Sequence, residues 1–248
     1  MWRIYILVVF LAFSWVGCNP GVEEHIKNGM AKCAKEDHKG AIADFTIAIE
    51  SDPKLDSAYL KRGMCRAHLG EFKASIEDFD KTIELNPKNN EAFFQRGCSR
   101  SDLGDIKGAM EDYNKAIEID PKDVMAIYNR AACKHNLGDF SGSIVDYTRV
   151  IELDPKDGQT WYNRGVSKFD LNDYDGALED YNKAIELNPK YGKAFYNRAL
   201  TKQNLDDLKG ACEDWTKAAE FGESRAIQDL ENIAPKEITL DRPYFPKK

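Results

Sequence analysis

Basic residues are not in excess in this chain of 248 residues. The 35 lysines and arginines are outnumbered by 42 aspartates and glutamates, which gives a net charge of −7. Nucleic-acid-binding proteins normally carry a basic stripe that displaces counterions from the phosphates, so we expect no nucleic-acid partner. Hydrophobic residues make up 42% of the sequence, which is enough to form a core and excludes a wholly disordered chain.

Recognisable catalytic and metal-binding motifs are also absent. The four histidines, His25, His38, His68 and His135, do not have metal-ligand spacing, and there is no His-Glu-x-x-His or Cys-x-x-Cys. The sequence has no Gly-rich phosphate loop and no Gly-x-Ser-x-Gly. We expect no enzymatic activity, no metal and no other cofactor, and we expect the histidines on the surface or lining a groove.

The N-terminus contains an uncharged, apolar stretch from Ile4 to Gly17. Its 14 residues are fewer than the ~20 that a membrane span needs, but they fit the apolar region of a signal peptide. Val16-Gly17-Cys18 resembles the lipobox of bacterial lipoproteins, although Trp15 stands where leucine is favoured. The resemblance implies removal of residues 1–17, a lipid on Cys18, a linker at 18–21, and a membrane-anchored protein in the bacterial cell envelope, facing the periplasm or exterior. An uncleaved membrane anchor and a buried N-terminal helix are the alternatives.

Five prolines set the organisation of the remaining chain. They follow one another at intervals of 34 residues: Pro53, Pro87, Pro121, Pro155 and Pro189. A fixed period of this length indicates repeats that bury their apolar faces only against their neighbours. The period divides the chain into six units: 22–55, 56–89, 90–123, 124–157, 158–191 and 192–225.

Each unit has the pattern of two helices joined by a turn. The second helix carries an apolar stripe, as in Ala41, Phe45 and Ala48, and it ends at the proline. The first helix repeatedly has glycine or alanine at one place, which indicates close packing of two helices. A glycine forms the turn in three units, at Gly70, Gly104 and Gly138, but Asn172 and Asp206 replace it in the last two; asparagine tolerates the left-handed conformation, aspartate less easily.

These features resemble the tetratricopeptide repeat (TPR), with Tyr59 or Trp161 near the start of a unit, a mid-helix glycine, Ala-x-x-x-Phe/Tyr-x-x-Ala and a closing proline. The resemblance covers residues 22–225 and implies an all-α, right-handed superhelical solenoid of six helix–turn–helix repeats. The sixth unit has Phe221-Gly222 where the proline would fall. We therefore expect a capping helix at 224–233, covering the last apolar face with Ala226, Ile227, Leu230 and Ile233, and an extended tail at 234–248.

Two columns of charge recur in the repeats. Aspartate stands at one place in all six units, and arginine at another place in five. An anion-binding stripe of arginines is one interpretation. The interpretation that we favour is a structural ladder in which each aspartate pairs with the arginine 18 residues downstream in the next unit, as Asp146 with Arg164 and Asp180 with Arg198.

In TPR domains the first helices line a concave groove that binds peptides or partner helices. The resemblance places in that groove Leu60, Phe94, Tyr128, Tyr162 and Tyr196, with Asn129, Asn163, Asn197 and Lys193 beside them. Aromatic rings that merely pack between helices are the alternative. Some family members clamp a chaperone's terminal carboxylate with lysines and asparagines; here Tyr128 and Ala132 interrupt that set, so we exclude it.

Five cysteines follow Cys18, namely Cys33, Cys65, Cys98, Cys133 and Cys212, and we expect most of them to be buried thiols. The sequence as a whole predicts a scaffold or adaptor lipoprotein that binds partner proteins at the cell envelope. The alternatives are a structural subunit of an envelope complex and, if the signal peptide is misread, a cytosolic or membrane-anchored TPR protein that resembles a co-chaperone.

Overall fold

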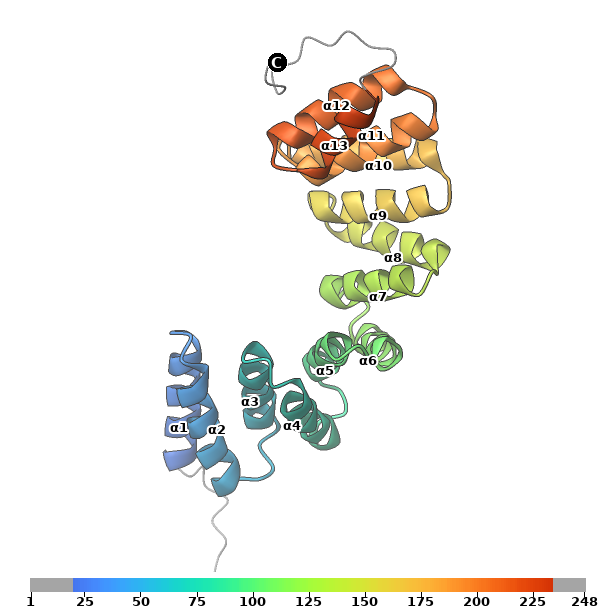
Figure 1. Cartoon of the computed structure of the whole chain (residues 1–248). Helices are drawn as coiled ribbons and strands as arrows, with labels where there is room; N and C mark the ends of the chain where they lie inside the picture. Colours follow the sequence, from blue (N-terminus) through green and yellow to red (C-terminus); the bar gives the residue numbers. More distant parts are fainter. Residues whose placement is uncertain (1–19, 234–248) are drawn as a thin grey trace, which may run out of the picture. The chain divides into compact units, whose positions relative to one another are not determined.

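The computed structural model describes residues 20–233. This part of the chain forms thirteen helices and contains no strand (Figure 1). It divides into two compact units at Pro87 and Lys88. Unit 1 contains α1 Pro20–Cys33, α2 His38–Ser51, α3 Asp56–His68 and α4 Phe72–Leu85. Unit 2 contains α5 Asn90–Asp102, α6 Ile106–Ile119, α7 Val124–Asn136, α8 Phe140–Leu153, α9 Gly158–Asp170, α10 Tyr174–Leu187, α11 Gly192–Asn204, α12 Leu208–Glu220 and α13 Arg225–Ile233.

The helices form six helix–turn–helix repeats followed by one further helix, which confirms the predicted fold class. An aspartate accepts a hydrogen bond from a backbone N–H at the start of most second helices; Asp105, for example, accepts from the Gly108 N–H at 3.0 Å. Gly70 adopts a φ of +76° in the turn that follows α3. Asn172 and Asp206 adopt φ values of +62° and +61° at the same place, so both take the conformation that glycine takes elsewhere.

The two helices of a repeat approach each other at the mid-helix glycine. A Cβ atom on Gly63 would lie 2.7 Å from the Phe79 ring, and one on Gly165 would lie 2.8 Å from the Tyr181 ring. Phe79 and Tyr181 are both fully buried. A glycine therefore lets an aromatic ring of the second helix pack directly on the backbone of the first helix.

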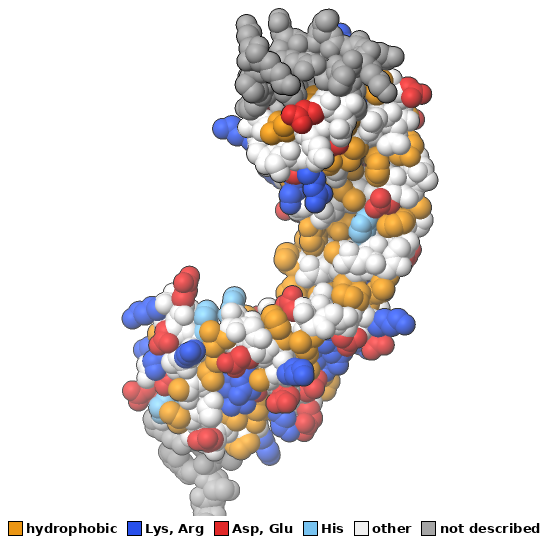
Figure 2. Space-filling model, viewed as in Figure 1, with side chains coloured by type: hydrophobic (Ala, Val, Ile, Leu, Met, Phe, Trp, Pro, Cys, Tyr) orange, Lys and Arg blue, Asp and Glu red, His pale blue; other side chains and the backbone are white. Residues whose placement is uncertain are grey.

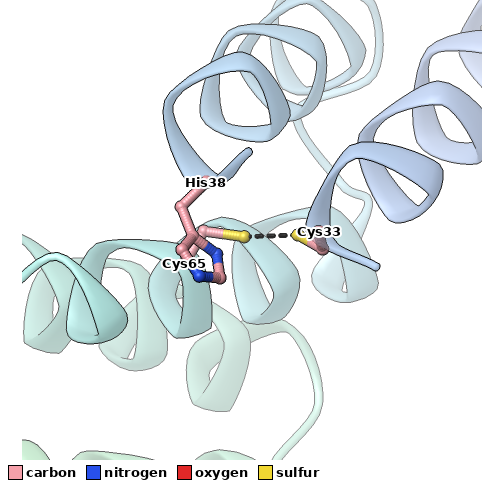
Figure 3. A group of neighbouring side chains, drawn as sticks. All are labelled: Cys33, His38 and Cys65. Carbon is pink, nitrogen blue, oxygen red and sulfur yellow. Dashed lines mark hydrogen bonds between the residues drawn. The ribbon is translucent and has the colours of Figure 1, made fainter. Parts of the chain in front are cut away.

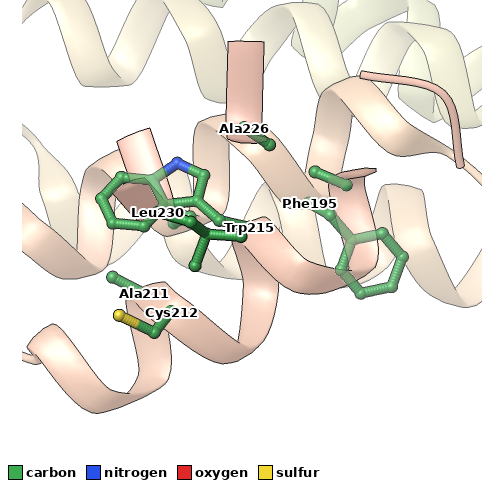
Figure 4. Close-up of a cluster of buried hydrophobic side chains, with 8 residues drawn as sticks. Phe195, Ala211, Cys212, Trp215, Ala226 and Leu230 are labelled. Carbon is green, nitrogen blue, oxygen red and sulfur yellow. The ribbon is translucent and has the colours of Figure 1, made fainter. Parts of the chain in front are cut away.

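Helix α13 covers the last repeat, as Figure 4 shows. Ala226 and Leu230 of α13 pack in a buried cluster with Phe195, Ala211 and Trp215. Ile227 was expected in this contact but is 39% exposed, because the buried face of α13 passes through positions 226 and 230. The side chain of Ile233 and the tail at 234–248 lie outside the described residues.

Three of the five cysteines in the described chain are buried: Cys65, Cys133 and Cys212. This confirms the prediction of mostly buried thiols. Cys212 lies in the core cluster of the last repeat. Cys33 and Cys98 are half-buried.

Candidate functional site

The predicted aromatic column in unit 2 runs along its first helices, α5, α7, α9 and α11. The rings are half-buried, and three of them pack against the second helix of their own repeat. Ring centroids are 6.1 Å apart for Phe94 and Tyr113, 5.6 Å for Tyr128 and Tyr147, and 6.0 Å for Tyr162 and Tyr181. Much of each ring therefore serves the packing of the repeat.

The predicted asparagines connect successive repeats. The Asn163 side chain donates a hydrogen bond to the Tyr128 hydroxyl at 2.6 Å, and Asn197 donates to Tyr162 at 3.0 Å. Asn129 donates to the Cys98 sulfur at 3.6 Å. Burial raises the pKa of Tyr128 and Tyr162, so both hydroxyls remain protonated and able to accept these bonds. These tyrosines and asparagines join neighbouring repeats, which matches the structural alternative for this column.

Leu60 does not belong to an accessible surface. It lies on α3 of unit 1 and is 5% exposed. An aliphatic side chain without a polar tip packs fully into the repeat, where a tyrosine keeps its hydroxyl near water. The expectation that Leu60 contacts a partner is therefore wrong.

A pocket of about 350 Å³ lies at the end of unit 2. Tyr162, Lys193, Tyr196 and Asn197, which are predicted site residues on α9 and α11, line one side of it. Glu223 and Arg225, from the turn before α13 and from its first residue, complete the lining. Lys193 and Arg225 are exposed. Two cations, one carboxylate, an amide and two aromatic rings thus surround one cavity.

Repeat positions do not predict Glu223 and Arg225 as lining residues, because the repeat pattern ends near residue 225. The missing closing proline at Phe221-Gly222 marks the place where the chain leaves the repeat pattern. Gly222 has a φ of +92° and redirects the chain into α13. The replacement of the closing proline by Phe221-Gly222 was therefore the sequence feature that could have indicated these additional lining residues.

The charged columns pair differently from the predicted ladder. Arg164 Nε and Nη2 donate to the two carboxylate oxygens of Asp180 at 2.8 and 2.7 Å. Arg130 pairs with Asp146 at 2.6 Å, and Arg198 pairs with Asp214 at 2.6 Å. Each arginine therefore holds the aspartate 16 residues downstream in its own repeat. The predicted pairs Asp146–Arg164 and Asp180–Arg198 are wrong.

The glycine contact explains this pairing. Arg164 precedes Gly165, and Asp180 precedes Tyr181, whose ring packs on Gly165. The two charged residues are consequently brought together where the two helices of one repeat meet. A second cation follows one turn later, since Lys168 Nζ lies 3.0 Å from Asp180 Oδ2.

The arginines still connect repeats, through neutral partners. Arg164 Nη1 donates to the Thr148 hydroxyl at 3.0 Å, and Arg198 Nη1 donates to Asn182 Oδ1 at 2.6 Å. These partners belong to the second helix of the preceding repeat. The arginine column is thus occupied by structural contacts, which leaves the anion-stripe interpretation without support.

The outer surface carries short-range ion pairs. Lys81 with Glu84, Lys115 with Glu118 and Lys183 with Glu186 are exposed pairs spaced three residues apart on second helices. In the view of Figure 2, basic and acidic side chains are interspersed over α1–α4. Exposed pairs of this kind contribute about 0.2–1 kcal/mol or less, so the glutamates suit control substitutions.

Among residues 20–233, no helix combines the length and the apolar composition needed to cross a bilayer. Cys18 and the preceding apolar stretch lie outside the described residues. The lipid anchor therefore stays a prediction.

Family comparisons agree with the repeat pattern. Tetratricopeptide repeat models match residues 26–90, 126–157, 158–191 and 180–213, and a TPR repeat model matches residues 100–138. No curated protein matches the sequence.

Solved structures with similar folds are numerous. YrrB, described as a TPR protein with an unusual peptide-binding site, has a TM-score of 0.68 and 21% identity, over 75% of this chain and 97% of YrrB. MamA from Desulfovibrio magneticus has a TM-score of 0.65 and 20% identity, over 68% and 96% of the two chains. A tetratricopeptide repeat protein from Parabacteroides merdae has a TM-score of 0.66 and 17% identity, over 87% and 99%. At these identities the likeness is one of fold.

Proposed function

Because the chain is a tetratricopeptide repeat protein, we propose that it is a non-enzymatic scaffold that binds an acidic, extended segment of a partner protein in the pocket at the end of unit 2. The family supports the general role, which is protein–protein interaction. The observation that carries the specific proposal is the cavity of about 350 Å³ with Lys193 and Arg225 at its wall.

The lining groups match the needs of an extended peptide. Lys193 and Arg225 can donate charge-assisted hydrogen bonds to a carboxylate, from an acidic side chain or a chain terminus. The Asn197 carbonyl oxygen and the Glu223 carboxylate can accept bonds from backbone N–H groups. Tyr162 and Tyr196 provide ring surface for an apolar side chain. A peptide-binding site in the similar fold of YrrB supports this kind of occupant.

Binding of synthetic peptides tests the proposal. The full-length protein, in detergent, is exposed to matched extended peptides that carry acidic, neutral or basic side chains. We expect the acidic set to bind best, and K193E and R225E each to weaken it about tenfold, since one charge-assisted hydrogen bond contributes about 1.5 kcal/mol or more. K209E is the matched control, because Lys209 is an exposed lysine of α12 outside the pocket.

Equal losses in K209E and K193E would show a general charge effect and no site at the pocket. Binding that instead responds to substitution of Glu118 or Glu186 would place the functional surface on the second helices. Binding of none of the peptides would favour the structural-subunit alternative.

We also propose that the protein is a lipoprotein of the bacterial cell envelope, anchored through Cys18. Val16-Gly17-Cys18 after an uncharged apolar stretch supports this location. C18S should abolish the lipid and leave an uncleaved precursor or a released protein, which membrane fractionation and mass spectrometry of the N-terminus distinguish from the native form. A C18S protein that is processed and retained like the native one would refute the lipid anchor. C98S, which changes a cysteine of α5, is the control.

A further inference from the structure

A second pocket, of about 250 Å³, lies within unit 1 and concentrates soft ligand atoms. Its lining includes the cysteines Cys33 and Cys65, the histidines His38 and His68, and the thioethers of Met30 and Met64. No Asp or Glu lines it among the described residues. Sulfur and imidazole without carboxylate suit thiophilic metal ions, whereas Ca²⁺ and Mg²⁺ prefer oxygen ligands.

Three of these side chains converge from three helices. Cys33 ends α1, His38 begins α2, and Cys65 lies on α3, as Figure 3 shows. The two sulfur atoms are 2.6 Å apart, and the potential ligand atoms of all three residues lie within 4.8 Å of one another. Helices of two successive repeats therefore bring together two cysteines and one histidine that form no contiguous motif in the sequence.

His38 supplies an independent observation. Its Nδ1 atom is buried and has no hydrogen-bond partner in the structure. Its ring stacks on that of His68, with centroids 4.8 Å apart and an interplanar angle of 7°. A buried nitrogen without a partner is costly, and a metal ion is one group that satisfies it.

The other repeats show that the fold does not require a histidine at the place of His38. Where His38 begins its second helix, the later repeats have Phe72, Ile106, Phe140, Tyr174 and Leu208. The first repeat thus has an imidazole where every later repeat has an apolar or aromatic residue, at the place where two thiols meet.

We propose that Cys33, His38 and Cys65 bind one thiophilic d¹⁰ metal ion, Cu(I) or Zn(II). This site is separate from the peptide pocket of unit 2. Bond lengths of about 2.3 Å to sulfur and about 2.0 Å to nitrogen place the two sulfurs about 3.7 Å apart in a tetrahedral site, so the thiols move apart by about 1 Å on binding. Cys33 is half-buried at a helix end, where its side chain can rotate.

The surroundings suit both ions. Two thiolates and a neutral imidazole balance the charge of Zn(II) and leave one negative charge with Cu(I), which Lys61 in the same lining opposes. His68, Met30 and Met64 are the candidates for a fourth ligand, and the thioethers favour Cu(I). On binding, the metal–sulfur bonds replace two S–H bonds and two protons leave to solvent.

Metal titration of the full-length, reduced protein under anaerobic conditions tests the site. Co(II) serves as the optical probe, and we expect one equivalent to produce the visible bands of a tetrahedral thiolate complex. One equivalent of Zn(II) or Cu(I) should abolish these bands, and mutual competition of the two ions identifies the preferred one.

The decisive variant is H38F, because phenylalanine already occupies this place in two other repeats. It should fold like the native protein, by circular dichroism, and bind the metal more than about 100-fold more weakly, since even an indirect supporting group is worth about 10- to 100-fold. C33S and C65S should lose binding in the same way. C98S is the matched control and should retain it, because Cys98 lies in unit 2.

Native-like binding by H38F, or an equal loss in C98S, would overturn the proposal. So would a reduced native protein that binds no Co(II), Zn(II) or Cu(I). A Cys33–Cys65 disulfide in the isolated protein, together with failure of the reduced form to bind metal, would identify the thiols as a redox pair instead.

Discussion

The two compact units use the same repeat but give its variable positions different chemistry. Unit 2 has tyrosines Tyr113, Tyr147 and Tyr181 on its second helices, where unit 1 has Phe45 and Phe79. Its first helices add tyrosines that accept hydrogen bonds from asparagines of the next repeat. Unit 1 instead concentrates thiols, imidazoles and thioethers in a pocket. The repeat fold therefore tolerates different side chains at its variable positions, and each unit can carry its own type of site.

The first repeat of unit 1 differs from the repeats of unit 2 in how it balances its buried aspartate. In unit 2, Asp180 is 1% exposed and receives Arg164 and Lys168, whose side chains are 13% and 15% exposed. In the first repeat of unit 1, Asn28 occupies the arginine place, and Asp44 is paired with Lys32, which is 42% exposed, and with His25. The Asp44 carboxylate is thus held by partners that water can reach, whereas Asp78 of the second repeat has two arginine partners, as the aspartates of unit 2 have two cations.

The largest expected effect on stability comes from removing a buried aspartate. D180A should lower the free energy of unfolding of unit 2 by about 3–5 kcal/mol, because it leaves two cations without their buried partner. D44A should cost unit 1 less, since Lys32 can return to water. Native-state hydrogen exchange measures each unit separately.

A double-mutant cycle adds a test of the pairing itself. The effects of D180A and R164A should be strongly non-additive, whereas those of D180A and R198A should add. Coupling between Asp180 and Arg198 alone would restore the predicted ladder.

Alkaline pH should destabilise unit 2 by ionising its buried tyrosines. Burial raises the pKa of Tyr113, Tyr147 and Tyr181 above the ordinary value of 10.0, so folding favours the protonated phenol. Stability from these groups is complete below pH 10 and is lost as the pH rises above it. The part of the tyrosinate absorbance that comes from Tyr113, Tyr147 and Tyr181 should therefore increase together with loss of helical circular dichroism above pH 10, while urea-unfolded protein titrates near 10. Full tyrosinate absorbance from an intact helical protein would contradict this.

A single hydroxyl tests the connection between repeats of unit 2. Y162F should lower the free energy of unfolding by about 1 kcal/mol, because it removes the acceptor for Asn197 and keeps the ring. Y59F in unit 1 is the control, since the structure gives the hydroxyl of Tyr59 no hydrogen bond. Urea denaturation monitored by hydrogen exchange should show a larger loss of stability in Y162F than in Y59F. Equal losses would mean that the hydrogen bond from Asn197 does not stabilise the protein.

The smallest expected effect concerns the last turn. D206G should raise the free energy of unfolding by about 0.5–1 kcal/mol, because Asp206 has a φ of +61° that glycine adopts without strain. G104D is the reverse substitution at a turn with a φ of +83° and should be destabilising. The melting temperatures of both variants measure this, and a loss of stability in D206G would indicate an undetected contact of the carboxylate.

The fold was predictable because its signals are local and recur from unit to unit. Pro155, the glycine of a turn and the stripe Ala177–Tyr181–Ala184 each act within one helix or one turn. The ion pairs were not predictable, since spacings of 16 and 18 residues both join the two columns. Only the contact of Gly165 with the Tyr181 ring decides which aspartate Arg164 meets.

The sites were predicted in part for a related reason. Lys193, Asn197 and two tyrosines were expected at an interaction surface, and they do line the end pocket, but Leu60 was placed there by repeat position and is buried. No sequence motif predicted a site at Cys33, His38 and Cys65, because four and 26 other residues separate them along the chain and two repeats must pack to bring them together. Repeat position predicts that equivalent residues have the same role in every unit. These residues matter because they differ from the equivalent residues of the other repeats.

The contact of α13 with the last repeat makes Trp215 a natural optical reporter. Its indole is fully buried and lies beside Leu230 of α13 (Figure 4). In a variant in which Trp215 is the only tryptophan, detachment of α13 exposes the indole to water and shifts its emission to longer wavelength. Quenching of this emission by a small solute then measures how often α13 detaches, without an attached dye. Since Glu223 and Arg225 of the peptide pocket belong to the same end of the chain, that emission also reports whether a bound segment holds α13 in place.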